Sequence, residues 1–106
     1  MAREVTWTLN ALEDLQSAAV YIELDSSYHA GAFVQAVFQA TESLSEFAER
    51  GRLVPELESD NMRELVVGRY RLIHRARANS VVVIRLIHGA RDFRSAWRSR
   101  ETESDG

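Results

Sequence analysis

Two apolar, strand-like segments make up residues 70–87, which read YRLIHRARANSVVVIRLI. β-Branched and aromatic side chains are frequent in both segments, and the dipeptide Ala78-Asn79 separates them. Such segments favour extended structure, and a two-residue break between them is typical of a β-hairpin. The stretch therefore predicts a pair of antiparallel strands, residues 70–77 and 80–87.

A two-residue turn would also fix the register of this strand pair. One face of the sheet would then carry arginines, and the other would be apolar and covered by helices. Counting outward from the turn gives the pairs Arg77 with Ser80, Arg75 with Val82, Ile73 with Ile84, and Arg71 with Leu86. The arginine face would hold Arg69, Arg71, Arg75 and Arg77, and the covered face Tyr70, Leu72, Ala76, Val81, Val83 and Ile87.

The N-terminal half reads as one strand and two helices. Residues 4–9 alternate polar and apolar side chains, which predicts a half-buried strand. Asn10 precedes Glu13 by three residues, the spacing of a capping box, and apolar residues recur at helical spacing behind it. A second helical pattern follows Asp25-Ser26-Ser27 and is expected to end near Arg50-Gly51. Both helices would have one apolar face, and we expect them to form an antiparallel pair on a flat surface.

The remaining segments complete a single α+β domain of residues 1–98, because 106 residues fit one folding unit. Residues 63–67 predict another strand, residues 91–98 a short C-terminal helix, and residues 99–106 a flexible tail. The predicted order is β-α-α-β-β-β. Two antiparallel N-terminal helices would pack on one face of a small, mostly antiparallel four-stranded sheet.

Composition narrows the classes of function. The chain has no cysteine, which excludes disulfides and thiolate metal sites, and its three histidines are scattered. We therefore expect no metal and no cofactor. The apolar runs, such as Val81–Ile84, are far shorter than the roughly 20 residues of a membrane span, so we expect a cytoplasmic protein.

Charge is distributed unevenly along the chain. Residues 1–60 carry three arginines and eleven acids, a net charge of −8, whereas residues 61–100 carry ten arginines and two acids, a net charge of +8. All thirteen basic residues are arginine. Codon bias would explain the missing lysines but not this clustering, which favours an anionic partner, either nucleic acid or an acidic protein segment.

Four short motifs stand out in the second half of the chain. They read GRLVPE at residues 51–56, REL at 63–65, GRYRLIHR at 68–75 and VIRLIHGARD at 83–92. Together they resemble the RelE/ParE superfamily of bacterial type II toxins. The resemblance runs from about Thr6 to Phe93. It implies the RelE/ParE-like fold and a toxin that a small, ParD-like or similar antitoxin holds inactive in a hetero-oligomer, with any operator DNA bound only through the antitoxin.

RelE-like members cleave mRNA on the ribosome, a reaction that needs an acid, a base and cations around the phosphate. By resemblance, Arg71 and Arg91 match two of the cations. Met62 and Glu64 stand where that family has lysines, and Trp97 stands where it has a tyrosine. Methionine and glutamate cannot replace lysine beside a phosphate, and an indole has no usable proton-transfer pKa. If the chain is nonetheless a metal-independent endoribonuclease, its catalytic candidates are Arg71, Arg91, His88 and Glu64.

Because the two lysines and the tyrosine of the RelE-like nucleases are missing, the sequence looks more like ParE, whose members poison DNA gyrase by binding it.

Several other residues have a structural or a binding interpretation. For His88 the alternative to catalysis is a structural hydrogen bond at a strand end, whereas His74 is interpreted as a core residue. Glu56 is expected to form an ion pair with Arg52 or Arg71. The candidates for binding an antitoxin or target are Arg52, Arg69, Arg71, Arg75, Arg77, Arg91, Arg94, Trp97 and Arg98.

Overall fold

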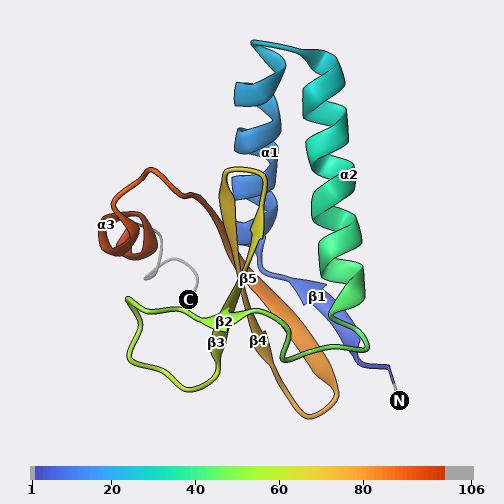
Figure 1. Cartoon of the computed structure of the whole chain (residues 1–106), viewed down its shortest axis with the longest axis vertical. Helices are drawn as coiled ribbons and strands as arrows, with labels where there is room; N and C mark the ends of the chain where they lie inside the picture. The colour runs from blue at the N-terminus through green and yellow to red at the C-terminus, as the bar shows by residue number, and fades with distance from the viewer. Residues whose placement is uncertain (1, 100–106) are drawn as a thin grey trace.

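The predicted hairpin lies inside a five-stranded sheet in the computed structural model, which describes residues 2–99 (Figure 1). Its strands pair in the order β1-β5-β4-β3-β2. β1 runs parallel to β5, and all other neighbours are antiparallel. The strands are β1 (Glu4–Trp7), β2 (Arg52–Leu53), β3 (Met62–Val67), β4 (Tyr70–Ala76) and β5 (Ser80–His88).

The expected α+β architecture is confirmed, with one correction to the strand count. The sequence predicts four strands, but Arg52 and Leu53 pair with Glu64 and Arg63 and add the short edge strand β2. Gly51 precedes it at φ +93°, and a Cβ there would lie 2.3 Å from the carbonyl oxygen of Glu64. Only glycine fits this approach without strain.

The two long helices are α1 (Leu9–Glu23) and α2 (Ser27–Ser43). Ser26, within the predicted start segment Asp25-Ser26-Ser27, caps α2 by accepting a hydrogen bond from the amide of His29 at 3.2 Å. The predicted cap of α1 is wrong, because Thr8 accepts from the amide of Ala11 at 3.0 Å and Asn10 is buried inside the helix. α2 also ends well before Arg50, since the chain turns there and buries Leu44 in the core.

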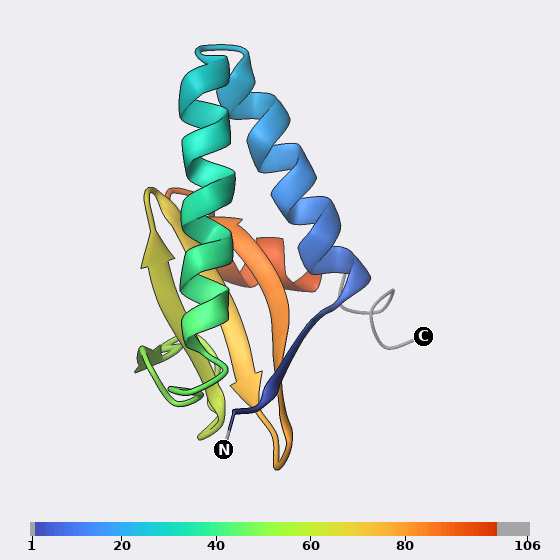
Figure 2. The same ribbon diagram turned by 90° about the vertical axis from the view of Figure 1, so that its right-hand side faces the viewer.

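Helices cover both faces of the sheet, as Figure 2 shows. The α1–α2 hairpin packs on one face, over a core that includes Val37, Leu72 and Val83. The predicted C-terminal helix is α3 (Phe93–Arg98), which packs on the other face against Ile73 and Ile87. Residues 100–106, most of the predicted tail, lie outside the described residues.

The register of the central hairpin is confirmed near the turn and wrong beyond it. Arg75 pairs with Val82, and the amide of Arg77 donates to the Ser80 carbonyl. A β-bulge next to Ile73 then shifts the partners by one residue. Ile73 faces Arg85 and Arg71 faces Ile87, so Ile87 belongs to the α3 side and not to the face that α1 and α2 cover.

Candidate functional site

Arg71 is the centre of an ion-pair cluster on the α3 face of the sheet. Its Nε donates to Glu64 Oε1 at 2.5 Å, and its two terminal nitrogens donate to the carboxylate of Glu56 at 3.0 and 2.7 Å. The guanidinium carbon lies 4.4 Å from the centroid of the Phe93 ring. The expected ion pair of Glu56 is therefore present, with Arg71 as the partner, and a bidentate fork holds it.

Glu64 lies beneath this cluster and is shared by two arginines. Its side chain is fully buried, and its second oxygen accepts from Arg52 Nε at 2.5 Å. The side chain of Arg52 is 67 % exposed, whereas that of Arg71 is 13 % exposed. Arg71 is thus held between two carboxylates and an aromatic ring and presents little of its guanidinium to solvent.

The charges of this cluster shift the pKa values of two members. The hydrogen bonds from Arg71 lower the pKa of Glu56, although partial burial opposes the shift. The Glu56 and Glu64 carboxylates raise the pKa of Arg71, the bond to Glu56 being the larger cause. Glu56 therefore remains ionised at neutral pH and is a poor general acid.

His88 and Arg91 lie in a different place. His88 Nδ1 accepts from the amide of Ala90 at 3.0 Å, and its ring meets the ring of Tyr70 edge-on at 4.9 Å. Tyr70 packs against the core that α1 and α2 cover, so His88 is on the face opposite Arg71. His88 and Arg91 line one pocket of about 320 Å³ together with Tyr70 and Ser17.

The four catalytic candidates are thus divided into two pairs. Arg71 and Glu64 form a closed ion-pair cluster on the α3 face, and His88 and Arg91 share a separate pocket where α1 meets the end of β5. A general base must reach the proton that it removes while the cations contact the same phosphate. The structure does not assemble the four side chains around one site.

The other binding candidates surround these two places. Arg94 donates to the Glu56 carbonyl at 2.9 Å, and Trp97 stacks on Phe93 with ring centroids 5.7 Å apart. Trp97 and Arg75 are half-buried, and the remaining candidates are exposed: Arg69, Arg77, Arg91 and Arg98. The basic block of residues 61–100 is consequently less available than its charge suggests, since Arg71 and Arg85 are neutralised internally.

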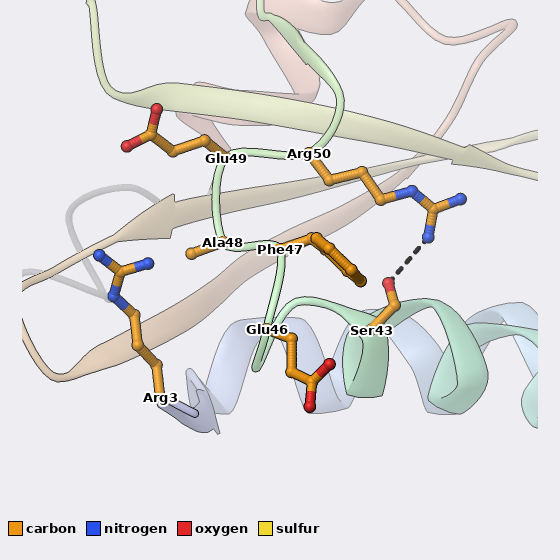
Figure 3. A pocket seen from close by; sticks show the side chains of 7 residues that line it. All are labelled: Arg3, Ser43, Glu46, Phe47, Ala48, Glu49 and Arg50. Carbon is orange, nitrogen blue, oxygen red and sulfur yellow. Dashed lines mark hydrogen bonds between the residues drawn. The ribbon is translucent and has the colours of Figure 1, made fainter. Parts of the chain in front are cut away.

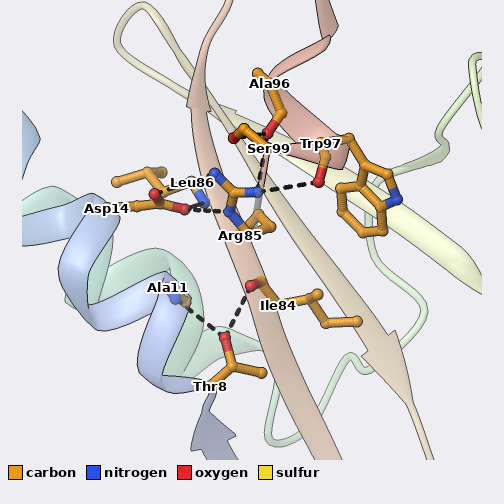
Figure 4. Close-up of polar contacts among 9 residues, drawn as sticks. All are labelled: Thr8, Ala11, Asp14, Ile84, Arg85, Leu86, Ala96, Trp97 and Ser99. Atoms are coloured by element: carbon orange, nitrogen blue, oxygen red, sulfur yellow. Dashed lines mark hydrogen bonds and ion pairs between the residues drawn. The ribbon is translucent and has the colours of Figure 1, made fainter. Parts of the chain in front are cut away.

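Sequence reasoning missed the second buried ion pair, between Asp14 on α1 and Arg85 on β5 (Figure 4). Arg85 Nε and a terminal nitrogen donate to the two Asp14 oxygens at 2.6 and 3.2 Å. Its other terminal nitrogen donates to the carbonyls of Ala96 and Trp97 at the end of α3, at 3.1 and 3.4 Å. This side chain links α1, β5 and α3, and its only sequence signal is one charge inside an apolar strand.

His74 is buried in the core, as expected, and its ring is poorly suited to carry charge. Its Nε2 lies 3.0 Å from the Arg50 carbonyl and donates to it, while Nδ1 is buried with no partner among the described residues. Burial lowers the pKa of His74, and nearby Arg63 adds to this effect. Protonation would place a second N–H in the core without an acceptor.

This geometry predicts a loss of stability in mild acid. Below about pH 6.5 the unfolded chain binds a proton at residue 74 before the folded chain does, so the free energy of unfolding should fall, by at most about 1.4 kcal/mol per pH unit. Urea denaturation between pH 7 and pH 5 measures the slope. His74→Gln, which keeps a donor for the Arg50 carbonyl, should flatten it, and the exposed-site control His29→Gln should not. An unchanged slope in His74→Gln would contradict the prediction.

Another hollow, of about 720 Å³, lies at the C-terminal end of α2 (Figure 3). It is lined by Phe47, whose side chain is largely exposed, and by charged residues of both signs, including Glu46 and Arg50. Arg50 donates to the Ser43 hydroxyl at 2.8 Å. None of the candidate residues lines this hollow. Within residues 2–99 we find no cluster of metal-ligating side chains and no helix with the length and apolarity of a membrane span.

The chain matches the model of a known protein family over most of its length. A family model described as "ParE toxin of type II toxin-antitoxin system, parDE" matches residues 5–93. The chain belongs to this family. The ParE-family assignment confirms the RelE/ParE resemblance seen in the motifs, and it makes the protein the toxin component of a type II toxin–antitoxin system.

The chain is also similar to a curated toxin and to a solved structure. The toxin RelE2 of Caulobacter vibrioides is 36 % identical over 89 residues, which cover 83 % of this ParE-family chain and 97 % of that protein. A solved structure described as a chromosomal ParDE toxin–antitoxin system from P. aeruginosa superposes with a TM-score of 0.67 at 21 % identity. That match covers 82 % of this chain and 96 % of the other. At this identity the structural match supports the fold.

Proposed function

We propose that this toxin inhibits growth by binding and poisoning DNA gyrase, without catalysis of its own. The observation that carries the proposal is the division of the nuclease candidates, because Arg71 and Glu64 neutralise each other on the α3 face while His88 and Arg91 line a separate pocket beside α1. Met62 and Trp97 support it, since neither can supply the cation or proton that the RelE resemblance expects at its position.

A cognate antitoxin is the second part of the proposal. We expect a small, ParD-like partner whose acidic and apolar segment covers exposed arginines and forms a hetero-oligomer with the toxin. The exposed guanidinium groups of Arg69, Arg77 and Arg98 supply charge complementarity for such a segment. Operator DNA would be bound through the antitoxin alone. Because gyrase is an intracellular target, the proposal places the toxin in the cytoplasm.

The alternative is a RelE-like, ribosome-dependent mRNA endoribonuclease. One observation favours it, namely that His88 and Arg91 share a pocket, where an imidazole and a guanidinium could reach the same phosphate. The relative named RelE2 points in the same direction. In this alternative Arg71 and Glu64 would be structural, and the catalytic set would be smaller than the one that the motifs imply.

Two assays run in parallel separate these functions. The purified toxin, freed of antitoxin, should trap gyrase–DNA cleavage complexes and leave mRNA intact in a translating extract. Arg98→Ala should weaken the gyrase effect by roughly tenfold, the cost of one charged contact, whereas His88→Ala should leave it unchanged. Codon-phased mRNA cuts that disappear in His88→Ala, with gyrase unaffected, would overturn the proposal in favour of the nuclease.

A further inference from the structure

The pocket that holds His88 and Arg91 has a closed floor and a polar rim. It lies where α1 meets the ends of β4 and β5 and has a volume of about 320 Å³, at the small end of the range for ligand sites. Ala18, Leu86 and the Asp14–Arg85 pair form its floor, since these residues are buried or nearly so. Exposed Ser17, Arg91 and Ser99 form the rim, and the Ser99 hydroxyl donates to the Ala96 carbonyl at 2.7 Å.

Hydrogen-bond donors dominate the lining. His88 Nδ1 accepts from the Ala90 amide, so the neutral ring carries its proton on Nε2, which has no partner among the described residues. The Arg91 guanidinium and the Ser17 hydroxyl likewise make no side-chain hydrogen bond within residues 2–99. Burial raises the pKa of Tyr70, so its hydroxyl remains protonated at neutral pH and is also able to donate.

Asp14 is the one carboxylate among the described residues that line the pocket, and it does not oppose an anion. Asp14 accepts two hydrogen bonds from Arg85 and a third, at 3.0 Å, from the amide of Leu86. The negative charge of Asp14 is therefore balanced by Arg85 in the floor of the pocket, on the side away from the rim. Arg91 has no ion-pair partner among the described residues and supplies a positive charge to the pocket.

We propose that this pocket binds a terminal phosphate group, a phosphate monoester or free phosphate. A dianion matches a lining of one free guanidinium, an imidazole N–H and two hydroxyls. The closed floor favours a group at the end of a molecule over the internal diester of a continuous nucleic-acid strand, which must leave the site on two sides. The site needs neither Arg71 nor Glu64, and it is independent of whether gyrase is the target.

Titration of the ¹⁵N-labelled full-length toxin, followed by amide chemical shifts at constant ionic strength, tests the proposal. The probes are inorganic phosphate, adenosine 5′-monophosphate and a dinucleoside monophosphate that has only an internal diester. Saturable shifts are expected at Ser17, His88 and Arg91 with the first two probes, and binding about tenfold weaker or less with the third. Tighter binding of the nucleotide than of phosphate would identify a nucleotide end as the ligand, and equal binding the phosphate group alone.

Matched variants separate a built site from general attraction of ions. Arg91→Gln should weaken phosphate binding by about tenfold or more, and Ser17→Ala by several-fold. Arg50→Gln removes the same charge at the far end of α2, where the side chain contacts the Ser43 hydroxyl, and should leave binding unchanged. Shifts that do not saturate, equal losses in Arg91→Gln and Arg50→Gln, or a diester that binds as tightly as the monoester would each overturn the proposal.

Discussion

Glu64→Gln is expected to lower the free energy of unfolding by about 3–5 kcal/mol, the cost of breaking a buried ion pair by removing one partner. The carboxylate of Glu64 is fully buried and accepts from Arg71 on one oxygen and from Arg52 on the other. Glutamine has the same shape, but its amide nitrogen would face a guanidinium N–H, donor against donor. Urea denaturation with linear extrapolation measures the loss.

The two arginines allow the origin of this loss to be tested. Arg52→Ala should cost no more than about 1 kcal/mol, because Arg52 is mostly exposed and water can replace it. Glu58→Gln removes an exposed carboxylate from the loop between β2 and β3 and should change the free energy of unfolding by less than about 0.5 kcal/mol. A loss in Glu64→Gln as small as that in Glu58→Gln would show that burial does not make the carboxylate essential.

Asp14→Asn is expected to cost a similar amount, about 3–5 kcal/mol, and to loosen α3 as well. Arg85 is 4 % exposed and would lose the carboxylate that balances its charge. The same guanidinium donates to the last carbonyls of α3, so any displacement of Arg85 leaves that end of the helix without its donor. Urea denaturation gives the loss, and amide hydrogen exchange of residues 93–98 reports on α3.

A double variant provides the internal check. Asp14→Leu combined with Arg85→Met removes both charges and should be less destabilised than the two single variants added together, because no buried charge is left unpaired. Glu23→Gln removes an exposed acid from the last turn of α1 and should leave α3 protected. Additive losses in the double variant would mean that the two side chains act separately.

Local patterns predicted the element order well, and contacts between distant residues account for the errors. β4 and β5 begin and end within one residue of their predicted bounds, because strand composition and the Ala78-Asn79 turn are local signals. The bulge beside Ile73 has no such signal, since the run Val81–Ile84 is apolar throughout and shows no alternation that a shift would break. β2 has only two residues, too few for any period.

In the candidate site, too, local signals were predictable and contacts between distant residues were not. The pairing of Glu56 with an arginine was predictable from the charge surrounding it in the sequence. The partition of Arg71 and His88 to opposite faces depends on tertiary packing, which sets their separate neighbours Phe93 and Tyr70. Asp14 and Arg85 are 71 residues apart, and no local pattern joins them.

The pairing of the first strand with the last has a consequence for synthesis on the ribosome. Glu4 of β1 lies opposite Ser80 of β5, and β1 joins the described sheet through β5. At translation rates of about 5–20 residues per second, the first strand waits about 4–15 seconds for its neighbour to be made. A nascent chain that stops before β5 has neither the central hairpin nor a place for β1. An interrupted message therefore yields no folded toxin, and an antitoxin already present can meet the chain while its sheet is still incomplete.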